Sequence, residues 1–316
     1  MPKSSQSHDP NPIPPHPIGH SIHRGQTFVV KLGGRLLTDP KVLDTLAGDL
    51  AELHREGVRV VVVHGGGPQL SQLSDRMGIQ TTKINGRRVT CSETLRLAKM
   101  VFAGEISTDV VAALRRHGVH GVGLSGVDGG VISAVRRPPV EMKNRETGET
   151  DIVDFQYVGD IYGVDATILM LLGNNGYIPV VASLAADDQG EVLNINADTI
   201  AADIAIALAA DKLLVMSDVP GVLGDVKDHD TRIPELDIED ARELVRSGTV
   251  GDGMIPKIDG AIRTLEGGVS DIHMMDGHTP HAILDEVRNP GSRGTFISGS
   301  RVRSRQEAVG VAEGSQ

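Results

Sequence analysis

The sequence predicts an αβα sandwich around a mainly parallel central sheet. Two β-branched runs, residues 28–30 and 58–63, are bounded by glycines and are typical of strands that are buried on both faces. Between these runs, apolar residues recur at the spacing of an amphipathic helix, at Leu43, Leu46, Ala47 and Leu50. A strand–helix–strand unit of this length is usually a right-handed parallel crossover, which places the helix on one face of the sheet.

The α/β alternation continues along most of the chain. Strands are predicted at residues 122–124, 178–181 and 213–216, each after a helical segment, and the longest of these helices covers about residues 196–209. Residues 129–164 break this rhythm. We predict β-rich irregular structure there, with a turn or hairpin tip at residues 145–148.

Both ends of the chain are predicted to lie outside the folded part. Residues 1–25 hold six of the 16 prolines and four of the 12 histidines, with few apolar side chains. Such a segment cannot bury enough surface to offset the entropy lost on ordering, so we expect a disordered tail. Metal binding by its histidines is the alternative interpretation. Residues 301–316 are predicted to be flexible as well.

Composition excludes several classes of function. The 316 residues include 31 Lys and Arg against 42 Asp and Glu, a net charge of −11, which argues against nucleic acid and anionic membranes as partners. The single cysteine, Cys91, excludes an intramolecular disulfide and a Cys-rich metal cluster, and we predict no metal site formed by the protein itself. With no span of about 20 uncharged apolar residues and no signal-peptide pattern, the expected location is the cytoplasm.

Glycine-rich turns follow the first two predicted strands. The first strand runs into Gly33 and Gly34, and the second runs into Gly65 and Gly66. Ligands of open parallel sheets bind beyond the carboxyl ends of the strands, where backbone without side chains approaches an anion closely. Two such turns favour an anion site, although each alone is explained by a tight strand-to-helix connection. Neither turn matches the P-loop or the dinucleotide-binding pattern.

Three cationic residues stand where an anionic ligand would explain them, and one carboxylate is singled out with them. Lys31 ends an apolar strand and Lys257 opens a helical pattern, and both positions disfavour an ammonium group unless an anion is near. Asp198 lies in the first turn of a predicted helix, and Arg88 follows an Asn-Gly hairpin turn that would hold its guanidinium toward a carboxylate. A strand-end lysine, a capping carboxylate and a solvated arginine are the ordinary structural alternatives.

The chain resembles the amino-acid kinase superfamily, and within it the N-acetylglutamate kinases. The resemblance covers about residues 26–298 and rests on six motifs in the order and approximate spacing of that superfamily: KLGG, HGGGPQ, NGRRVT, NINAD, SDVPGVL and GDGMIPK. The likeness to acetylglutamate kinases in particular rests on NGRRVT, NINAD and GDGMIPK.

The resemblance implies transfer of the γ-phosphoryl group of ATP, with Mg²⁺, to the side-chain carboxylate of N-acetyl-L-glutamate, a step of arginine biosynthesis. It implies that Lys31 and Lys257 stabilise the transition state and that Asp198 holds both ammonium groups in place. The residues implied to bind the acyl substrate are Gly65, Gly66, Arg88 and Asn194. Those implied to bind ATP are Gly33, Gly34, Asp218, Val219, Pro220, Gly221, Val222, Leu223, Thr249, Val250 and Gly251.

The resemblance also implies two lobes and an assembly. Residues 26–195 would form the lobe for the acyl substrate and for dimerisation, and residues 196–300 would form the nucleotide-binding lobe. Arginine-inhibited hexameric members carry a helix before the first strand, but here a Pro/His-rich tail takes that place. We therefore expect a homodimer formed through the first lobe.

Two other functions are left open by the sequence. The substrate could instead be an N-acylated 2-aminoadipate from lysine biosynthesis, which is one methylene longer than N-acetylglutamate. One methylene changes the binding free energy in a pocket by only about 1–3 kcal/mol. Residues 136–154 form a long stretch near the expected acyl-substrate lobe that could alter this specificity. From another class, the chain could be a non-catalytic regulator that binds ATP or an amino acid, although intact Lys31, Asp198 and Lys257 argue against it.

Overall fold

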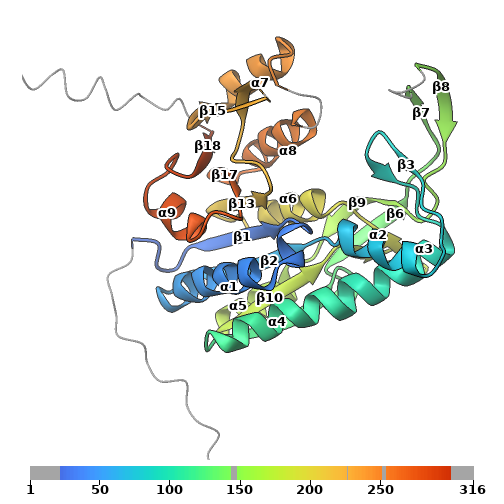
Figure 1. Cartoon of the computed structure of the whole chain (residues 1–316). Helices are drawn as coiled ribbons and strands as arrows, with labels where there is room; N and C mark the ends of the chain where they lie inside the picture. The colour runs from blue at the N-terminus through green and yellow to red at the C-terminus, as the bar shows by residue number, and fades with distance from the viewer. Residues whose placement is uncertain (1–21, 144–147, 226, 251–253, 300–316) are drawn as a thin grey trace, which may run out of the picture.

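One large sheet runs through the whole structure, with helices on both of its faces (Figure 1). The computed structural model describes residues 22–143, 148–225, 227–250 and 254–299. The eight strands of the sheet are, in spatial order, β16 (Glu235–Asp237), β18 (Gly294–Ser298), β17 (Asp271–Asp276), β13 (Lys212–Ser217), β1 (Thr27–Leu32), β2 (Arg59–His64), β10 (Tyr177–Ala182) and β5 (His120–Ser125). Only β17 and β18 pair antiparallel, so the predicted mainly parallel sheet is confirmed.

Alternate residues of the central strands enter two separate cores. Phe28 and Val30 of β1 pack on one face, while Val29 packs on the other. The first core lies under α1 (Pro40–Arg55), α2 (Gly67–Arg76), α3 (Ser92–Ala98), α4 (Ser107–Arg116) and α9 (Ala282–Arg288). The second lies under α5 (Thr167–Asn174), α6 (Ala197–Ala207), α7 (Ile238–Arg246) and α8 (Ile255–Glu266). Burial on both faces explains the continuous Val and Ile runs of the sequence.

Local signals in the sequence account for the first crossover. Asp39 caps α1 by accepting a hydrogen bond from the backbone N–H of Lys41 at 2.8 Å, and Pro40 occupies the first helical position. The predicted apolar stripe of this helix is buried, since Leu46 and Leu50 are each 1% exposed. The strand–helix–strand unit predicted from these residues is therefore confirmed.

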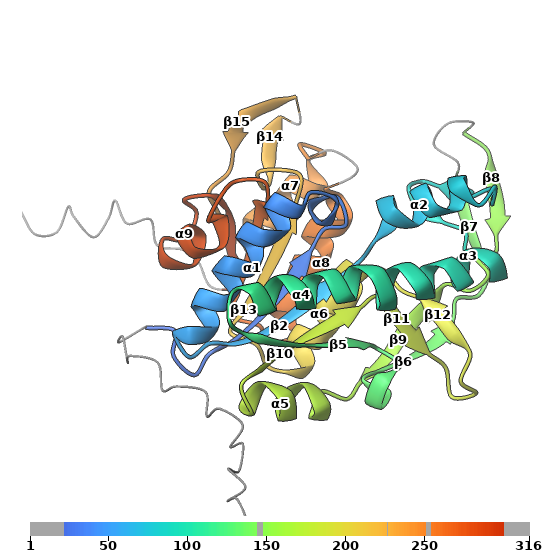
Figure 2. The same ribbon diagram turned by 60° about the horizontal axis from the view of Figure 1, so that its bottom comes forward.

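The β-rich stretch predicted at residues 129–164 is confirmed as well. It contributes β6 (Ile132–Arg136) and β9 (Gly159–Val164) to a second, four-stranded sheet. The other two strands of this sheet are β11 (Leu184–Ala186) and β12 (Val192–Asn194). Between β6 and β9, the chain forms an antiparallel pair, β7 (Val140–Lys143) and β8 (Thr150–Val153). Residues 144–147, on which most of the predicted hairpin tip falls, lie outside the described part. Figure 2 shows this hairpin projecting at the end of the molecule away from α9.

Two further hairpins and three helical segments complete the described structure. The hairpins pair β3 (Lys83–Ile84) with β4 (Arg87–Arg88), and β14 (Leu223–Asp225) with β15 (Asp228–Arg232). A π-helical segment, Lys99–Ile106, joins α3 to α4, and short 3₁₀ turns cover Leu36–Thr38 and Asp128–Gly130. No helix among the described residues is both long enough and apolar enough to cross a membrane.

The folded part begins earlier than the tail boundary predicted at residue 25. Residues 22–25 form a turn, and the N–H of Gly25 donates to the carbonyl oxygen of Gly57 at 2.9 Å. His23 in this turn is buried edge-on against Phe28. The rest of the two predicted tails, residues 1–21 and 300–316, lies outside the described residues.

A buried carboxylate fixes the loop that follows α9. Glu286 is fully buried and accepts hydrogen bonds from the backbone N–H groups of Gly291, Arg293 and Gly294, at 2.7 to 2.9 Å. It also lies 2.9 Å from Nδ1 of the buried His273 on β17. Burial alone would raise the pKa of Glu286, but the hydrogen bonds from His273 and the backbone outweigh it and lower that pKa. The ionised carboxylate thus joins α9, β17 and the entry to β18.

Replacing Glu286 should therefore destabilise the fold strongly. Glu286→Ala leaves three backbone N–H groups without their acceptor, and each such loss costs about 1–3 kcal/mol, so we expect the free energy of unfolding to fall by about 3 kcal/mol or more. The control is Asp285→Ala, which removes one exposed ion pair to Arg293 and should cost about 1 kcal/mol or less. Urea denaturation followed by circular dichroism measures both. Equal costs for the two variants would contradict this account of the loop.

Candidate active site

The two glycine-rich turns lie against each other beyond the carboxyl ends of β1 and β2. A Cβ at position 34 would lie 2.9 Å from Cδ of Pro68 and 3.3 Å from Cα of Gly66. A Cβ at position 66 would lie 2.3 Å from Cδ1 of Ile106, because the π-helical segment packs over this turn. Packing this close, against Pro68 and backbone at Gly34 and against side chains at Gly66, leaves room only for glycine, which explains two of the four predicted glycines.

A cavity of about 260 Å³ opens beside the turns, and we call it the glycine-turn cavity. It brings together six residues that the sequence analysis selected: Lys31, Gly34, Gly65, Gly66, Arg88 and Asn194. Phe102 of the π-helical segment and Ser183, after β10, also line it, and neither carries a signal that the sequence analysis could use. The cavity lies at the carboxyl edge of the parallel sheet, where ligands of such sheets bind.

The start of α6 carries the central carboxylate of the site. Asn196 caps this helix by accepting a hydrogen bond from the N–H of Asp198 at 2.8 Å, as the sequence predicted. The carboxylate of Asp198 forms an ion pair with Nζ of Lys31 at 2.8 Å, and the Lys31 side chain is only 10% exposed. The strand-end lysine is therefore not directed to solvent but held by a carboxylate.

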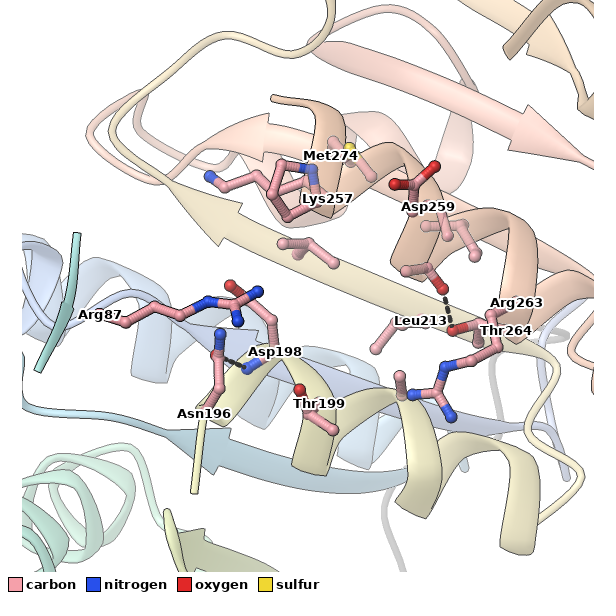
Figure 3. A pocket seen from close by; sticks show the side chains of 16 residues that line it. Arg87, Asn196, Asp198, Thr199, Leu213, Lys257, Asp259, Arg263, Thr264 and Met274 are labelled. Atoms are coloured by element: carbon pink, nitrogen blue, oxygen red, sulfur yellow. Dashed lines mark hydrogen bonds between the residues drawn. The ribbon is translucent and has the colours of Figure 1, made fainter. Parts of the chain in front are cut away.

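Lys257, in the first turn of α8, faces the same carboxylate across a second cavity (Figure 3). This α6–α8 cavity, of about 340 Å³, has apolar walls from β13 and β17 and has Asp198, Lys257, Asn196 and Arg87 among its polar lining residues. Burial lowers the pKa of Lys257, and the positive charge of Lys31 lowers it further, whereas the charge of Asp198 raises it. Two lysines from different elements thus meet around one aspartate.

The Asn-Gly hairpin turn predicted before Arg88 is confirmed. Asn85 and Gly86 have φ angles of +49° and +79°, as a type I′ turn requires. Arg88 is half-buried, and its Nη2 donates to the carbonyl oxygen of Gly67 at 3.1 Å and to Oγ of Ser71 at 2.6 Å. Its Nη1 is buried without a hydrogen-bond partner among the described residues, and burial lowers the pKa of Arg88. A solvated surface arginine would show neither feature.

Asn194 also lines the glycine-turn cavity, and hydrogen bonds from its backbone and its side chain hold it there. Asn194 ends β12, and its backbone N–H donates to the carbonyl oxygen of Tyr157 at 2.8 Å. Its side-chain Nδ2 donates to Oγ1 of the buried Thr90 at 3.1 Å. Asn194 and Arg88 thus approach one cavity from two different sheets.

Of the described residues that were predicted to bind ATP, only Gly34 lines one of these two cavities. Asp218, after β13, pairs with Arg35, which follows the first glycine turn. Val222 and Leu223 are buried in the core, and the N–H of Val222 donates to Oγ1 of Thr295 at 2.8 Å. Gly221 has a φ of +138°, so its conformation requires glycine.

The electrostatics nevertheless link Asp218 to the site. Burial alone would raise the pKa of Asp218, but hydrogen bonds and the positive charges of Arg35 and Lys257 outweigh it and lower that pKa. In the second predicted ATP segment, Oγ1 of Thr249 lies 2.8 Å from Oγ of Ser247 and Val250 is buried. Gly251 lies outside the described residues. The pairing of Arg35 with Asp218 was missed by the sequence analysis because it depends on β1 and β13 being neighbours.

No protein-held metal site is evident in the described part of the chain. No group of three or more His, Cys, Asp or Glu side chains is arranged to hold a metal ion there. The charged groups that face the cavities are mostly cationic, and they suit an anionic ligand better than a metal ion.

This fold places two glycine-rich turns and two lysines together at the carboxyl edge of a mainly parallel sheet, the arrangement of an α/β protein suited to anionic ligands. The model of the Amino acid kinase family matches residues 26–276, and the chain belongs to that family. Within it, the chain is similar to curated acetylglutamate kinases. It is 45% identical to that of Sorangium cellulosum over 85% of this chain and 94% of the relative. It is 41% identical to that of Methanococcoides burtonii over 85% of this chain and 88% of the relative.

Solved structures of related proteins share the fold. An N-acetylglutamate synthase from Neisseria gonorrhoeae, in complex with coenzyme A and N-acetyl-glutamate, superposes with a TM-score of 0.73 at 28% identity over 88% of this chain. The chain spans only 60% of that synthase. A carbamate kinase from Giardia lamblia bound to AMP-PNP gives a TM-score of 0.61 at 17% identity over 87% of this chain and 99% of that kinase, a likeness of fold alone.

The histidine that precedes the second glycine turn should make stability depend on pH. His64 is fully buried, its Nδ1 lies 3.1 Å from the carbonyl oxygen of Gly65, and burial lowers its pKa to about 4. Between about pH 6.5 and 4 the unfolded chain binds a proton that the folded protein does not. The free energy of unfolding should therefore fall by up to about 3 kcal/mol as the pH drops through this range.

Unfolding measured in urea at several pH values tests this prediction. In His64→Leu the fall between pH 6.5 and 4 should be smaller by about that amount, whereas the same change at the exposed His120 should leave it unaltered. An unchanged pH profile in His64→Leu would show that His64 is not the group responsible.

Proposed function

We propose that this chain phosphorylates the side-chain carboxylate of N-acetyl-L-glutamate with ATP to give N-acetylglutamyl 5-phosphate, a step of arginine biosynthesis, in the cytoplasm. The observation that carries the proposal is the grouping of Lys31 and Lys257 around Asp198, next to a cavity that contains an unpartnered arginine nitrogen. Relatives named acetylglutamate kinases, 39–45% identical over most of the chain, support the choice of reaction.

The chemistry suits a site without a general base. A carboxylate oxygen of the acyl substrate attacks the γ-phosphorus of ATP, the bond to the β,γ-bridging oxygen breaks, and ADP leaves. Because nucleophile and phosphate are both anionic, catalysis requires alignment in line and relief of their repulsion. In our proposal Lys31 and Lys257 supply that positive charge, and Asp198 orients both ammonium groups.

The acyl substrate is proposed to occupy the glycine-turn cavity. Arg88 would bind the α-carboxylate through its buried Nη1, which has no partner among the described residues and gains one when an anion enters. The backbone of Gly65 and Gly66 and the amide of Asn194 would hold the acetamido and carboxylate groups. Gly33 and Gly34 would cradle the transferring phosphoryl group.

The nucleotide is proposed to approach from the side of Lys257. We propose that the segments Asp218–Leu223 and Thr249–Gly251 form the nucleotide pocket. The charge of Lys257 lowers the pKa of Asp218, which supports a place for the first of these segments near Lys257. Mg²⁺ binds substrate phosphates readily while keeping several waters, so we propose that it enters with ATP rather than on a site made by the chain. It would neutralise charge on the phosphates during transfer.

The proposed lobes correspond to the two halves of the central sheet. Residues 26–195 contribute β1, β2, β10 and β5, and residues 196–300 contribute β13, β17, β18 and β16. We propose a homodimer formed through the first half, because β5 is an unpaired edge strand there. Exposed apolar side chains of the same half, Met170, Leu171 and Tyr177, support a partner surface.

Acyl-phosphate formation is the first test of this function. N-acetyl-L-glutamate and N-acetyl-2-aminoadipate are offered separately with ATP and Mg²⁺, and the product is trapped as its hydroxamate. We expect turnover with a clear preference for the glutamate derivative. Preference for the aminoadipate derivative would assign the protein to lysine biosynthesis and leave the proposed mechanism unchanged. Binding of ATP without turnover of either compound would contradict the proposal and favour a regulator.

The two lysines provide the second test. Lys31→Ala and Lys257→Ala should each lower kcat by about 10²–10³, as expected when one preorganised donor is lost, while circular dichroism and the melting temperature report the folded state. Lys41→Ala, on the exposed face of the first turn of α1, is the matched control and should leave kcat unchanged. Wild-type turnover in either Lys31→Ala or Lys257→Ala would rule out the proposed roles.

A further inference from the structure

The two consecutive arginines of the β3–β4 hairpin differ in which of the two cavities described above they line, although both also line a third cavity, of about 260 Å³, together with Asn194 and Asn196. Successive residues of a strand point to opposite faces, so Arg87 and Arg88 of β4 diverge. Arg88 turns to the start of α2 and lines the glycine-turn cavity, but not the α6–α8 cavity. Arg87 does the reverse. It lines the α6–α8 cavity together with Asp198 and Lys257, and it is absent from the lining of the glycine-turn cavity.

The guanidinium of Arg87 extends over the first turn of α6. Figure 3 shows it pointing toward Asp198 and Asn196, on the opposite side of the α6–α8 cavity mouth from Lys257. Arg87 is exposed, and among the described residues no ion pair or hydrogen bond engages its side chain. Its charge is therefore available to a ligand at the mouth of the cavity.

The charge balance at this mouth favours a polyanion. The α6–α8 cavity is lined by three cations, Arg87, Lys257 and Arg263, and by two carboxylates, Asp198 and Asp259. Arg263 is paired with Asp203, and Lys31 adds a positive charge through its ion pair with Asp198, so positive charge is in excess around Asp198. The amino end of α6 adds partial positive charge at the same place. In a chain with a net charge of −11, such a local excess suits a ligand with several negative charges, as a nucleotide's phosphate chain has.

We propose that Arg87 contacts the phosphates of the bound nucleotide, while its neighbour Arg88 holds the acyl substrate. This inference rests on the proposed function, and it adds a nucleotide-binding residue that lies outside the predicted ATP segments. A bidentate guanidinium suits phosphate oxygens, and Arg87 shares its cavity with Lys257, the lysine on the proposed nucleotide side. The β3–β4 hairpin would then contact both the nucleotide and the acyl substrate.

The two arginines should give opposite kinetic signatures. Arg87→Gln should raise the KM for ATP by about 10- to 100-fold, the effect of losing one charged hydrogen bond, with the KM for the acyl substrate within about twofold of wild type. Arg88→Gln should raise the KM for the acyl substrate and spare that for ATP. If the hairpin had only a structural role, the KM for ATP and the KM for the acyl substrate would rise together in both variants.

Direct binding tests the inference without turnover. Titration calorimetry with AMP-PNP and Mg²⁺ at physiological salt should show about 10- to 100-fold weaker binding to Arg87→Gln, with partial recovery in Arg87→Lys, which keeps the charge but loses the planar fork. The charge-matched control is Arg115→Gln, at the exposed end of α4, which should bind as tightly as the wild-type protein.

Two results would overturn the inference. One is unchanged AMP-PNP binding in Arg87→Gln. The other is an Arg87→Gln protein in which only the KM for the acyl substrate rises, which would assign Arg87 to the other cavity. Weaker AMP-PNP binding in a protein that fails to phosphorylate N-acetylglutamate would support Arg87 as a phosphate contact while the proposed substrate fails, so the two proposals are distinguishable.

Discussion

The ion pair between Lys31 and Asp198 is the interaction on which the site depends. Lys31 is the residue before the last of β1, in the middle of the sheet, and its side chain is 10% exposed, so its ammonium group would be costly without a partner. Asp198 lies in α6, which follows β12 of the four-stranded sheet and is far in the sequence from the glycine turns. The pair therefore joins the glycine turns to the half of the molecule that carries α8. Lys257 faces the same carboxylate, and the charge of Asp198 raises its pKa, so one aspartate interacts with both lysines.

Sheet order explains why these groups meet. β13 lies directly beside β1 and runs parallel to it, so the connections after both strands emerge at one edge. Arg35 from the first connection therefore pairs with Asp218 from the second. The close packing of Gly34 on Pro68 and Gly66 leaves no room for side chains between the turns after β1 and β2. Topology and glycine together bring three segments that are distant in the sequence, the connections after β1, β2 and β13, to one edge of the sheet.

The local sequence pattern predicts the helices, strands and turns, but it does not predict the contacts between them. The strands at β1 and β2, the helix between them, the Asn85–Gly86 turn and the cap at Asn196 follow from neighbouring residues and were predicted correctly. Periodicity could not tell that Arg88 is half-buried on Ser71, because that contact joins a hairpin to a distant helix. It also could not tell that Val222 belongs to the core, or that a π-helical segment covers Gly66, since both depend on packing between segments far apart in sequence.

The overall charge of the chain and the charge of its site oppose each other. A net charge of −11 repels anionic substrates at long range, whereas the cavities present Lys31, Lys257 and two hairpin arginines. At physiological salt the screening length is about 8 Å, so charges on the outer surface have little influence inside the cavities. Affinity for anions must then come from short-range contacts with groups already fixed in place, such as the buried Nη1 of Arg88. In the proposed function, anionic substrates are therefore bound at contact distance rather than attracted from afar, and the proposed specificity depends on how accurately the hairpin and the glycine turns hold those groups.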